Sequence, residues 1–181
     1  MRSRKATSTR LALEQRHAAD RLLQGEIDLA LESLAAGVPS RVGSHLVRVL
    51  CAVLEPSWEE HASFQEDVLF EIMAANGTPA AELRTLLEHL RREHVEIGKR
   101  NRETAAILGT LAGGRQIAGT AVMVSIEETL TLRRRHASAE STLEHLLPAE
   151  LEPHDCDRFD RWAAARTTPA FPVNLILDVW E

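Results

Sequence analysis

Four of the eight histidines in this chain are spaced so that antiparallel helices would bring them to one level. In two antiparallel helices, residues lie at the same height when they are equally far from the connecting loop. The midpoints between successive members of the set fall at position 39, near position 77 and at position 115. Each midpoint lies in or beside a helix-breaking sequence, namely Gly37-Val38-Pro39-Ser40, Asn76-Gly77-Thr78-Pro79 or Gly113-Gly114. The set consists of His17, His61, His94 and His136.

The apolar stripes of the expected helices support the same set. His94 shares a helix face with Leu87, Leu90 and Ile97, and the other three also align with apolar residues. A lone histidine on such a stripe is usually a core residue with a hydrogen-bond partner. Four at one level, from four helices, would each need such a partner, so the pattern favours a metal site. His45 does not match another histidine in distance from a connecting loop. His145 and His154 lie near or beyond the end of the last expected helix.

Carboxylates one helical turn from a histidine can reach the same metal ion. Glu140 follows His136 at this spacing, and Asp20 lies about one turn after His17. Gln65 stands one turn after His61, where a second carboxylate would be expected, and the adjacent Glu66 is turned about 100° away from that stripe. His89 and Glu93 have the same spacing, but their polar surroundings favour a solvated pair.

The elements that must position these residues are four long helices. Apolar residues recur at spacings of three and four over residues 9–36, 41–75, 80–111 and 116–147. Short connections between long amphipathic helices predict an all-α, antiparallel up-down-up-down four-helix bundle. Pro56 lies inside the second segment and should kink or divide that helix.

The chain divides into three expected regions. Residues 1–9 are basic and rich in Ser and Thr, and we expect them to form a disordered lead. Residues 10–150 form the bundle, and residues 151–181 form a C-terminal extension. Within the extension, residues 157–166 favour a short helix. The apolar segment Phe171 to Leu177 would either fold back over the bundle or dock on a partner or a second copy, as in a homodimer.

Composition excludes several classes of protein. The formal net charge of −6 disfavours a nucleic-acid binder. No apolar run of about 20 residues is present, so a membrane-spanning helix is not expected. Two cysteines are too few for a disulfide framework. These features, with no apolar signal sequence, predict a cytoplasmic protein.

The histidine pattern resembles the hemerythrin family, specifically the bacterial hemerythrin-like HHE cation-binding domains. Members of that family carry a first-helix histidine, H-x-x-x-E followed by Leu-Phe, a third-helix Glu-His, and a second H-x-x-x-E. The matching positions here are His17, His61 to Gln65 with Leu69-Phe70, Glu93-His94, and His136 to Glu140. The resemblance covers roughly residues 10–150.

The resemblance implies a non-haem centre of two iron ions with histidines as terminal ligands and carboxylates as bridges. Glu140 would be a bridging ligand, and the site would bind dioxygen or nitric oxide, or sense redox state. Repair of iron–sulfur clusters under oxidative or nitrosative stress is the alternative that the family offers. The side chains expected to limit water access to the site are Trp58, Phe64, Leu90 and Leu132.

Gln65 departs from the family pattern, because a neutral amide is a poor bridge between iron ions. Three alternatives follow: Asp20 or Glu66 substitutes as a ligand, the site holds one iron ion or two loosely held ones, or the bundle is degenerate and serves as a protein-interaction module. The chain has no tyrosine for radical chemistry, so binding or sensing is expected rather than substrate oxidation.

Other metal sites have less support. A ferritin-like di-iron site needs Glu-x-x-His on two helices, and only Glu14 to His17 matches. A structural zinc site is possible with these donors, but four long helices scarcely need a metal to fold.

Overall fold

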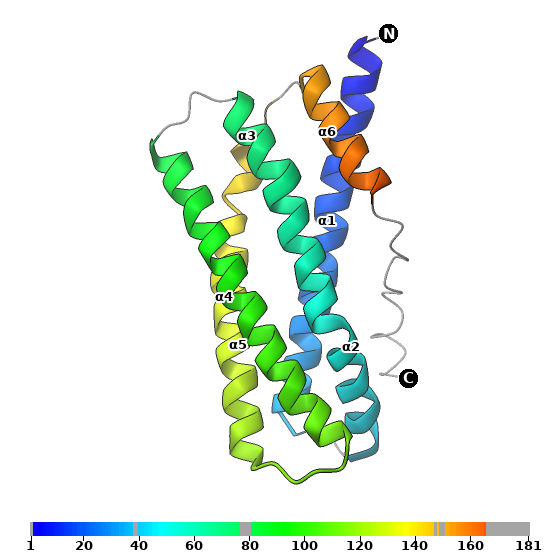
Figure 1. Cartoon of the computed structure of the whole chain (residues 1–181), viewed down its shortest axis with the longest axis vertical. Coiled ribbons are helices and arrows are strands. Elements are labelled where there is room, and N and C mark those ends of the chain that lie inside the picture. The colour runs from blue at the N-terminus through cyan, green and yellow to red at the C-terminus, as the bar shows by residue number, and fades with distance from the viewer. Residues whose placement is uncertain (1, 38–39, 77–80, 147, 149–150, 166–181) are drawn as a thin grey trace.

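The computed structural model describes residues 2–37, 40–76, 81–146, 148 and 151–165, and these residues are helical with short connections and no strand (Figure 1). The all-α prediction is confirmed at this level. The elements in chain order are α1 (Arg2–Ala35), α2 (Ser40–Phe64), a π-helical turn η1 (Gln65–Leu69), α3 (Phe70–Asn76), α4 (Ala81–Ala112), α5 (Gly119–Glu140), a 3-10 turn η2 (Leu143–Leu146) and α6 (Pro153–Ala164).

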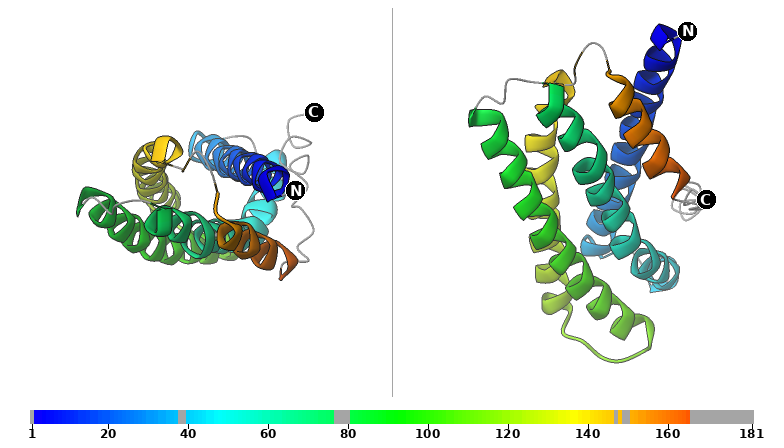
Figure 2. Two further views of the ribbon diagram at one scale, coloured as in Figure 1. Left: turned by 90° about the horizontal axis from the view of Figure 1, so that it is seen from above. Right: turned by 45° about the horizontal axis from the view of Figure 1, so that its top comes forward.

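The long helices α1, α2, α4 and α5 pack side by side (Figure 1). α1 contacts α2 and α5, and α4 contacts the same two helices from the other side, so each of the four has two neighbours. η1 and α3 continue the line of α2, and α6 lies alongside the N-terminal half of α1 (Figure 2). No helix among the described residues is long and apolar enough to cross a membrane.

Two apolar clusters fill the interior, and a polar layer separates them. One cluster contains Ile27, Leu50 and Ile126, and the other contains Leu13, Phe64 and Leu90. On each long helix a group of buried polar residues lies, in sequence, between residues that contact the two clusters. The polar layer includes His17 and Asp20 of α1, Ser57 and His61 of α2, Glu93 and His94 of α4, and Arg133 and His136 of α5. The candidate ligands are therefore held between two close-packed regions.

Pro56 does not divide the second helical segment, so of the two expected effects, a kink or a division, the division is wrong. α2 runs through Pro56 without a break, because Pro56 and Ala52 both lie on its exposed side. The Ala52 carbonyl, which loses its backbone donor to the proline, can therefore face solvent. The regular helix is interrupted instead at η1, directly after the turn that carries His61.

The prediction of a disordered lead over residues 1–9 is wrong for residues 2–9, which form the first turns of α1. Tertiary contacts explain the difference. Lys5 lies 3.0 Å from Asp157 and 3.1 Å from Asp160 of α6, and Ala6 packs against the cluster that contains Leu13. The expected short helix of the extension is present as α6, whereas the apolar segment from Phe171 to Leu177 lies outside the described residues.

Deletion of residues 2–9 should therefore destabilise the protein. Loss of Ala6 packing and of the buried Thr9 should lower the free energy of unfolding by about 1–2 kcal/mol. For a chain of this size, the melting temperature should fall by about 2–8 °C. Thermal denaturation followed by circular dichroism measures the change, and an unchanged melting temperature would show that these residues add nothing.

Candidate metal centre

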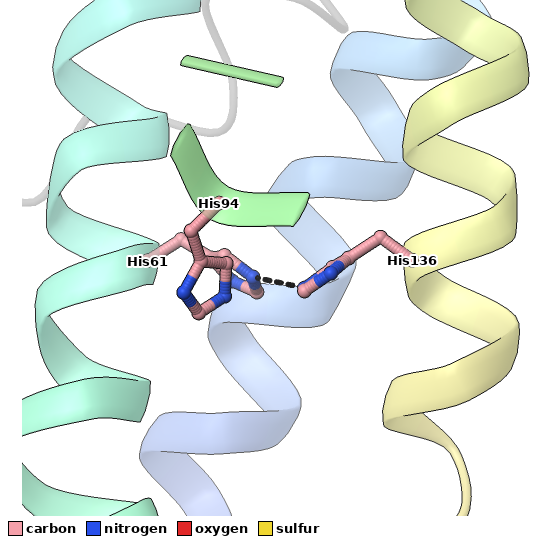
Figure 3. A group of neighbouring side chains, drawn as sticks. All are labelled: His61, His94 and His136. Atoms are coloured by element: carbon pink, nitrogen blue, oxygen red, sulfur yellow. Dashed lines mark hydrogen bonds between the residues drawn. The ribbon is translucent and has the colours of Figure 1, made fainter. Parts of the chain in front are cut away.

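Three buried histidines from three helices converge in the polar layer (Figure 3). His61 comes from α2, His94 from α4 and His136 from α5, and one ring nitrogen of each lies within 4.8 Å of the others. All three side chains are almost fully buried. Equal distance from the connecting loops therefore predicts correctly that these three residues meet. Together they could hold a metal ion.

Each of the three imidazoles has its Nδ1 atom against a carboxylate from another element. His61 Nδ1 lies 2.6 Å from Asp20 Oδ2, and His94 Nδ1 lies 2.6 Å from Glu66 Oε1. His136 Nδ1 lies 3.2 Å from Glu93 Oε2. A carboxylate that accepts the Nδ1 proton fixes the tautomer and orientation of the ring, so that the lone pair lies on Nε2.

The Nε2 atoms of His61 and His136 lie 3.2 Å apart (Figure 3). If both Nδ1 atoms carry the protons, two lone pairs face each other at this distance, which is unfavourable without a proton or a cation between them. Two nitrogens that each lie about 2.1 Å from one ion are separated by about 3.0–3.5 Å in octahedral or tetrahedral geometry. The observed separation therefore suits a shared metal ion.

Burial favours the neutral form of His94 and His136. Burial is the largest cause, and together with the neighbouring His61 and His94 it lowers the pKa of His136 to about 2. Burial is also the largest cause of the lowered pKa of His94, against the opposing effect of Glu66. Neutral imidazole is the form that binds metals, so the lowered pKa values keep His94 and His136 in that form at neutral pH.

Gln65 separates the three histidines from a second polar group. Its Oε1 atom lies 3.1 Å from His94 Nε2, and its Nε2 atom donates a hydrogen bond of 2.5 Å to Glu140 Oε1. His17 Nδ1 lies 3.5 Å from the same Glu140 oxygen. Burial raises the pKa of Glu140 and lowers the pKa of His17 to about 4. His17 and Glu140 therefore lie on the far side of Gln65 from His94.

The π-helical turn explains why both Gln65 and Glu66 reach the centre. In a regular α-helix Glu66 would point about 100° away from the stripe of His61. Residues 65–69 instead form a π-helix, which changes the phase of the side chains. Gln65 is fully buried and contacts Glu140, while Glu66 reaches His94 from the edge of the layer. Asp20 and Glu66 thus orient histidines from their outer sides.

Aromatic rings cover the three histidines. The Trp58 ring stacks on His61 at a centroid distance of 4.6 Å, and it also contacts the rings of His94 and His136 edge-on. Its Nε1 atom donates a hydrogen bond of 3.0 Å to the His94 carbonyl. Phe70, which the sequence reasoning did not select as a lining residue, stacks on His94 with its centroid 5.8 Å away. These rings exclude water from the histidines.

The other residues expected to line the site are more distant or less buried. Phe64 lies 6.5 Å from His17, between ring centroids, and 5.0 Å from Trp162 of α6. Leu90 is fully buried in the cluster that contains Phe64. Leu132 is only half-buried.

Glu93 is the residue that sequence reasoning placed wrongly. Its contact with His89 is present at 3.1 Å, but Glu93 is buried rather than solvated. One carboxylate oxygen contacts His136, and the other accepts a hydrogen bond of 2.6 Å from Arg135. The signal was available, because Glu93 lies three residues after Leu90 on a buried stripe.

Comparisons of this chain with protein-family models, with curated proteins and with solved structures find no match.

The metal-free protein should lose stability as the pH falls below about 6.5. The unfolded chain takes up protons on His17, His94 and His136 near pH 6.5, whereas their folded pKa values are lower. Each histidine then reduces the free energy of unfolding by up to about 1.4 kcal/mol per pH unit, down to its folded pKa. Glu140 acts in the opposite direction because its pKa is raised, but one carboxyl group does not offset three imidazoles.

Urea denaturation of the metal-free protein at pH 7, 6 and 5 measures this dependence. His17→Gln should make the slope shallower, whereas His45→Gln, at an exposed position on α2, should leave it unchanged. Equal stability at the three pH values would contradict the burial of neutral histidines.

Proposed function

We propose that this chain is a hemerythrin-like protein whose non-haem iron centre binds dioxygen or nitric oxide. In this proposal α1, α2, α4 and α5 form an up-down-up-down four-helix bundle around the centre. The observation that carries the proposal is the convergence of His61, His94 and His136, each with Nδ1 against a carboxylate, in a buried layer. This arrangement is typical of histidines that bind metals.

The donor set is compatible with iron. Imidazole nitrogens bind iron as they bind zinc, copper and nickel, whereas thiolates would favour zinc, copper(I) or iron–sulfur clusters. Neither cysteine contributes: Cys51 donates to the Ala105 carbonyl, and Cys156 of α6 packs in the cluster that contains Leu13. The histidines supply only three ligands, so an iron ion bound there would have coordination positions left for a small ligand.

The protein side chains have distinct roles in this proposal. The carboxylates of Asp20, Glu66 and Glu93 accept the Nδ1 protons, which leaves the lone pair of each ring on Nε2 for a metal ion. Trp58 and Phe70 limit the access of water to the rings. A ferrous ion bound there would supply reversible coordination of a diatomic ligand, and the buried surroundings would protect it from hydrolysis and oxidation.

A second metal position would use the group on the far side of Gln65. His17 and Glu140 offer an imidazole nitrogen and a carboxylate oxygen that lie 3.5 Å apart. Gln65 contacts both Glu140 and His94, so it occupies the place that a bridging carboxylate would take between two ions. Because its amide is neutral, we propose that the three-histidine site binds iron more tightly than the second position does.

Anaerobic reconstitution with ferrous iron, followed by desalting and metal analysis, tests the proposed function. The wild-type protein should retain between one and two iron ions per chain and develop near-ultraviolet absorption in air. His94→Ala should reduce iron affinity at least about 100-fold, because an effect of about 10- to 100-fold is already typical for the outer partners of such ligands.

The matched control is His45→Ala, which changes an exposed histidine of α2 and should leave iron binding unchanged. Circular dichroism should show the same helicity for both variants. A wild-type protein that stays helical yet retains no iron would refute the metal centre and favour an interaction module.

Gln65→Glu should increase iron occupancy. A carboxylate at this position would place a negative charge between His94 and Glu140, where a bridging ligand is needed. We expect occupancy to rise towards two ions per chain, with affinity for the second ion increased about 10-fold or more. The isosteric control is Gln65→Met, which should not raise occupancy. Equal iron content in Gln65→Glu and wild type would contradict a ligand position at Gln65.

A further inference from the structure

α1 has a second apolar face that none of the described helices covers. Leu11, Leu22 and Leu29 are 54%, 58% and 55% exposed, although α1 also buries Leu13 and Ile27 against its neighbours. The exposed leucines lie roughly opposite the buried residues on the helical wheel, since 100° separates successive positions. This face therefore points away from the metal centre and from α2, α5 and α6.

The exposed residues follow a heptad pattern. Along this face the spacings alternate between four and three residues, and the seam covers about 27 Å of the helix at 1.5 Å per residue. The seam, which we call the α1 seam, consists of Leu11, Gln15, Ala18, Leu22, Gly25 and Leu29, all exposed. A Cβ atom added at Gly25 would meet nothing within 4 Å, so the seam is open at that position. An alternation of four and three is the spacing by which one helix packs along another.

The side-chain volumes fit an antiparallel copy of the same seam. When two copies pair about a twofold axis at position 20, Leu22 lies opposite Ala18 of the second copy, and Gln15 lies opposite Gly25. Leu11 then lies opposite Leu29 at each end. Every large side chain in the middle meets a small one, whereas a parallel pair would set Gly25 against Gly25 and Ala18 against Ala18 and leave gaps.

The area is sufficient for a specific contact of moderate strength. The exposed parts of the three leucines from each of two copies amount to about 600 Å². The intervening seam residues of both copies bring the total area to about 1,000 Å², the lower limit for a specific interface. The second copy is therefore an adequate occupant by area as well as by shape. We propose that two copies of this chain associate through antiparallel pairing of their α1 seams.

Sedimentation velocity of the metal-free 181-residue protein tests association. At about 100 µM the wild type should sediment as a dimer of twice 20.1 kDa. Leu22→Glu should weaken association at least 10-fold, because it sets a charge against Ala18 of the second copy. The matched control is Val95→Glu, at a position 74% exposed on α4, which should remain dimeric. A monomeric wild type, as expected if residues 166–181 cover the seam, would overturn the proposal.

Cysteine cross-linking tests the orientation. In a background of Cys51→Ser and Cys156→Ser, Ala18→Cys and Leu22→Cys proteins are mixed and oxidised. Antiparallel pairing should give mainly the mixed disulfide between positions 18 and 22, several-fold faster than either homodimer. Faster homodimer formation would overturn the antiparallel arrangement. The readouts do not involve iron, so they stand apart from the proposed metal function.

Discussion

The hydrogen bonds between three imidazole Nδ1 atoms and three carboxylates control the structure of the centre. Asp20 on α1 contacts His61 on α2, Glu66 in the π-turn contacts His94 on α4, and Glu93 on α4 contacts His136 on α5. Each bond joins two helical elements and fixes one ring, so the same interactions connect the long helices and direct three Nε2 atoms inward. Burial strengthens these bonds, since few water molecules compete for the carboxylates.

Such a polar layer is costly to bury, and the rest of the fold reflects that cost. Unpaired imidazoles and carboxylates in an apolar interior would each lose several kcal/mol of solvation. Close-packed clusters on both sides offset this loss, and Trp58 fills the space beside all three rings. Arg133, which is buried over the face of Trp58 and paired with Asp28, extends the paired polar layer by one turn.

Periodicity and loop position suffice to predict the helices and three converging histidines, because both depend on local spacing. They could not predict the π-turn, whose change of phase brings Gln65 and Glu66 into the layer together. Nor could they identify the partners of Glu93, since His136 and Arg135 belong to another helix. The helical start of α1 depends likewise on α6, which is distant in sequence. Long-range contacts determine the features that local patterns leave open.

The charge around the centre suits one divalent cation in the three-histidine site. The carboxylates of Asp20, Glu66 and Glu93 contact the histidines, and the Arg135 guanidinium contacts Glu93. Three carboxylates and one guanidinium leave two negative charges, which a divalent ion bound to the imidazoles would balance. Burial raises the pKa of Glu140 and so disfavours a further negative charge there. A neutral Gln65 between the two groups is consistent with this balance, because a carboxylate would add charge that only a second cation could compensate.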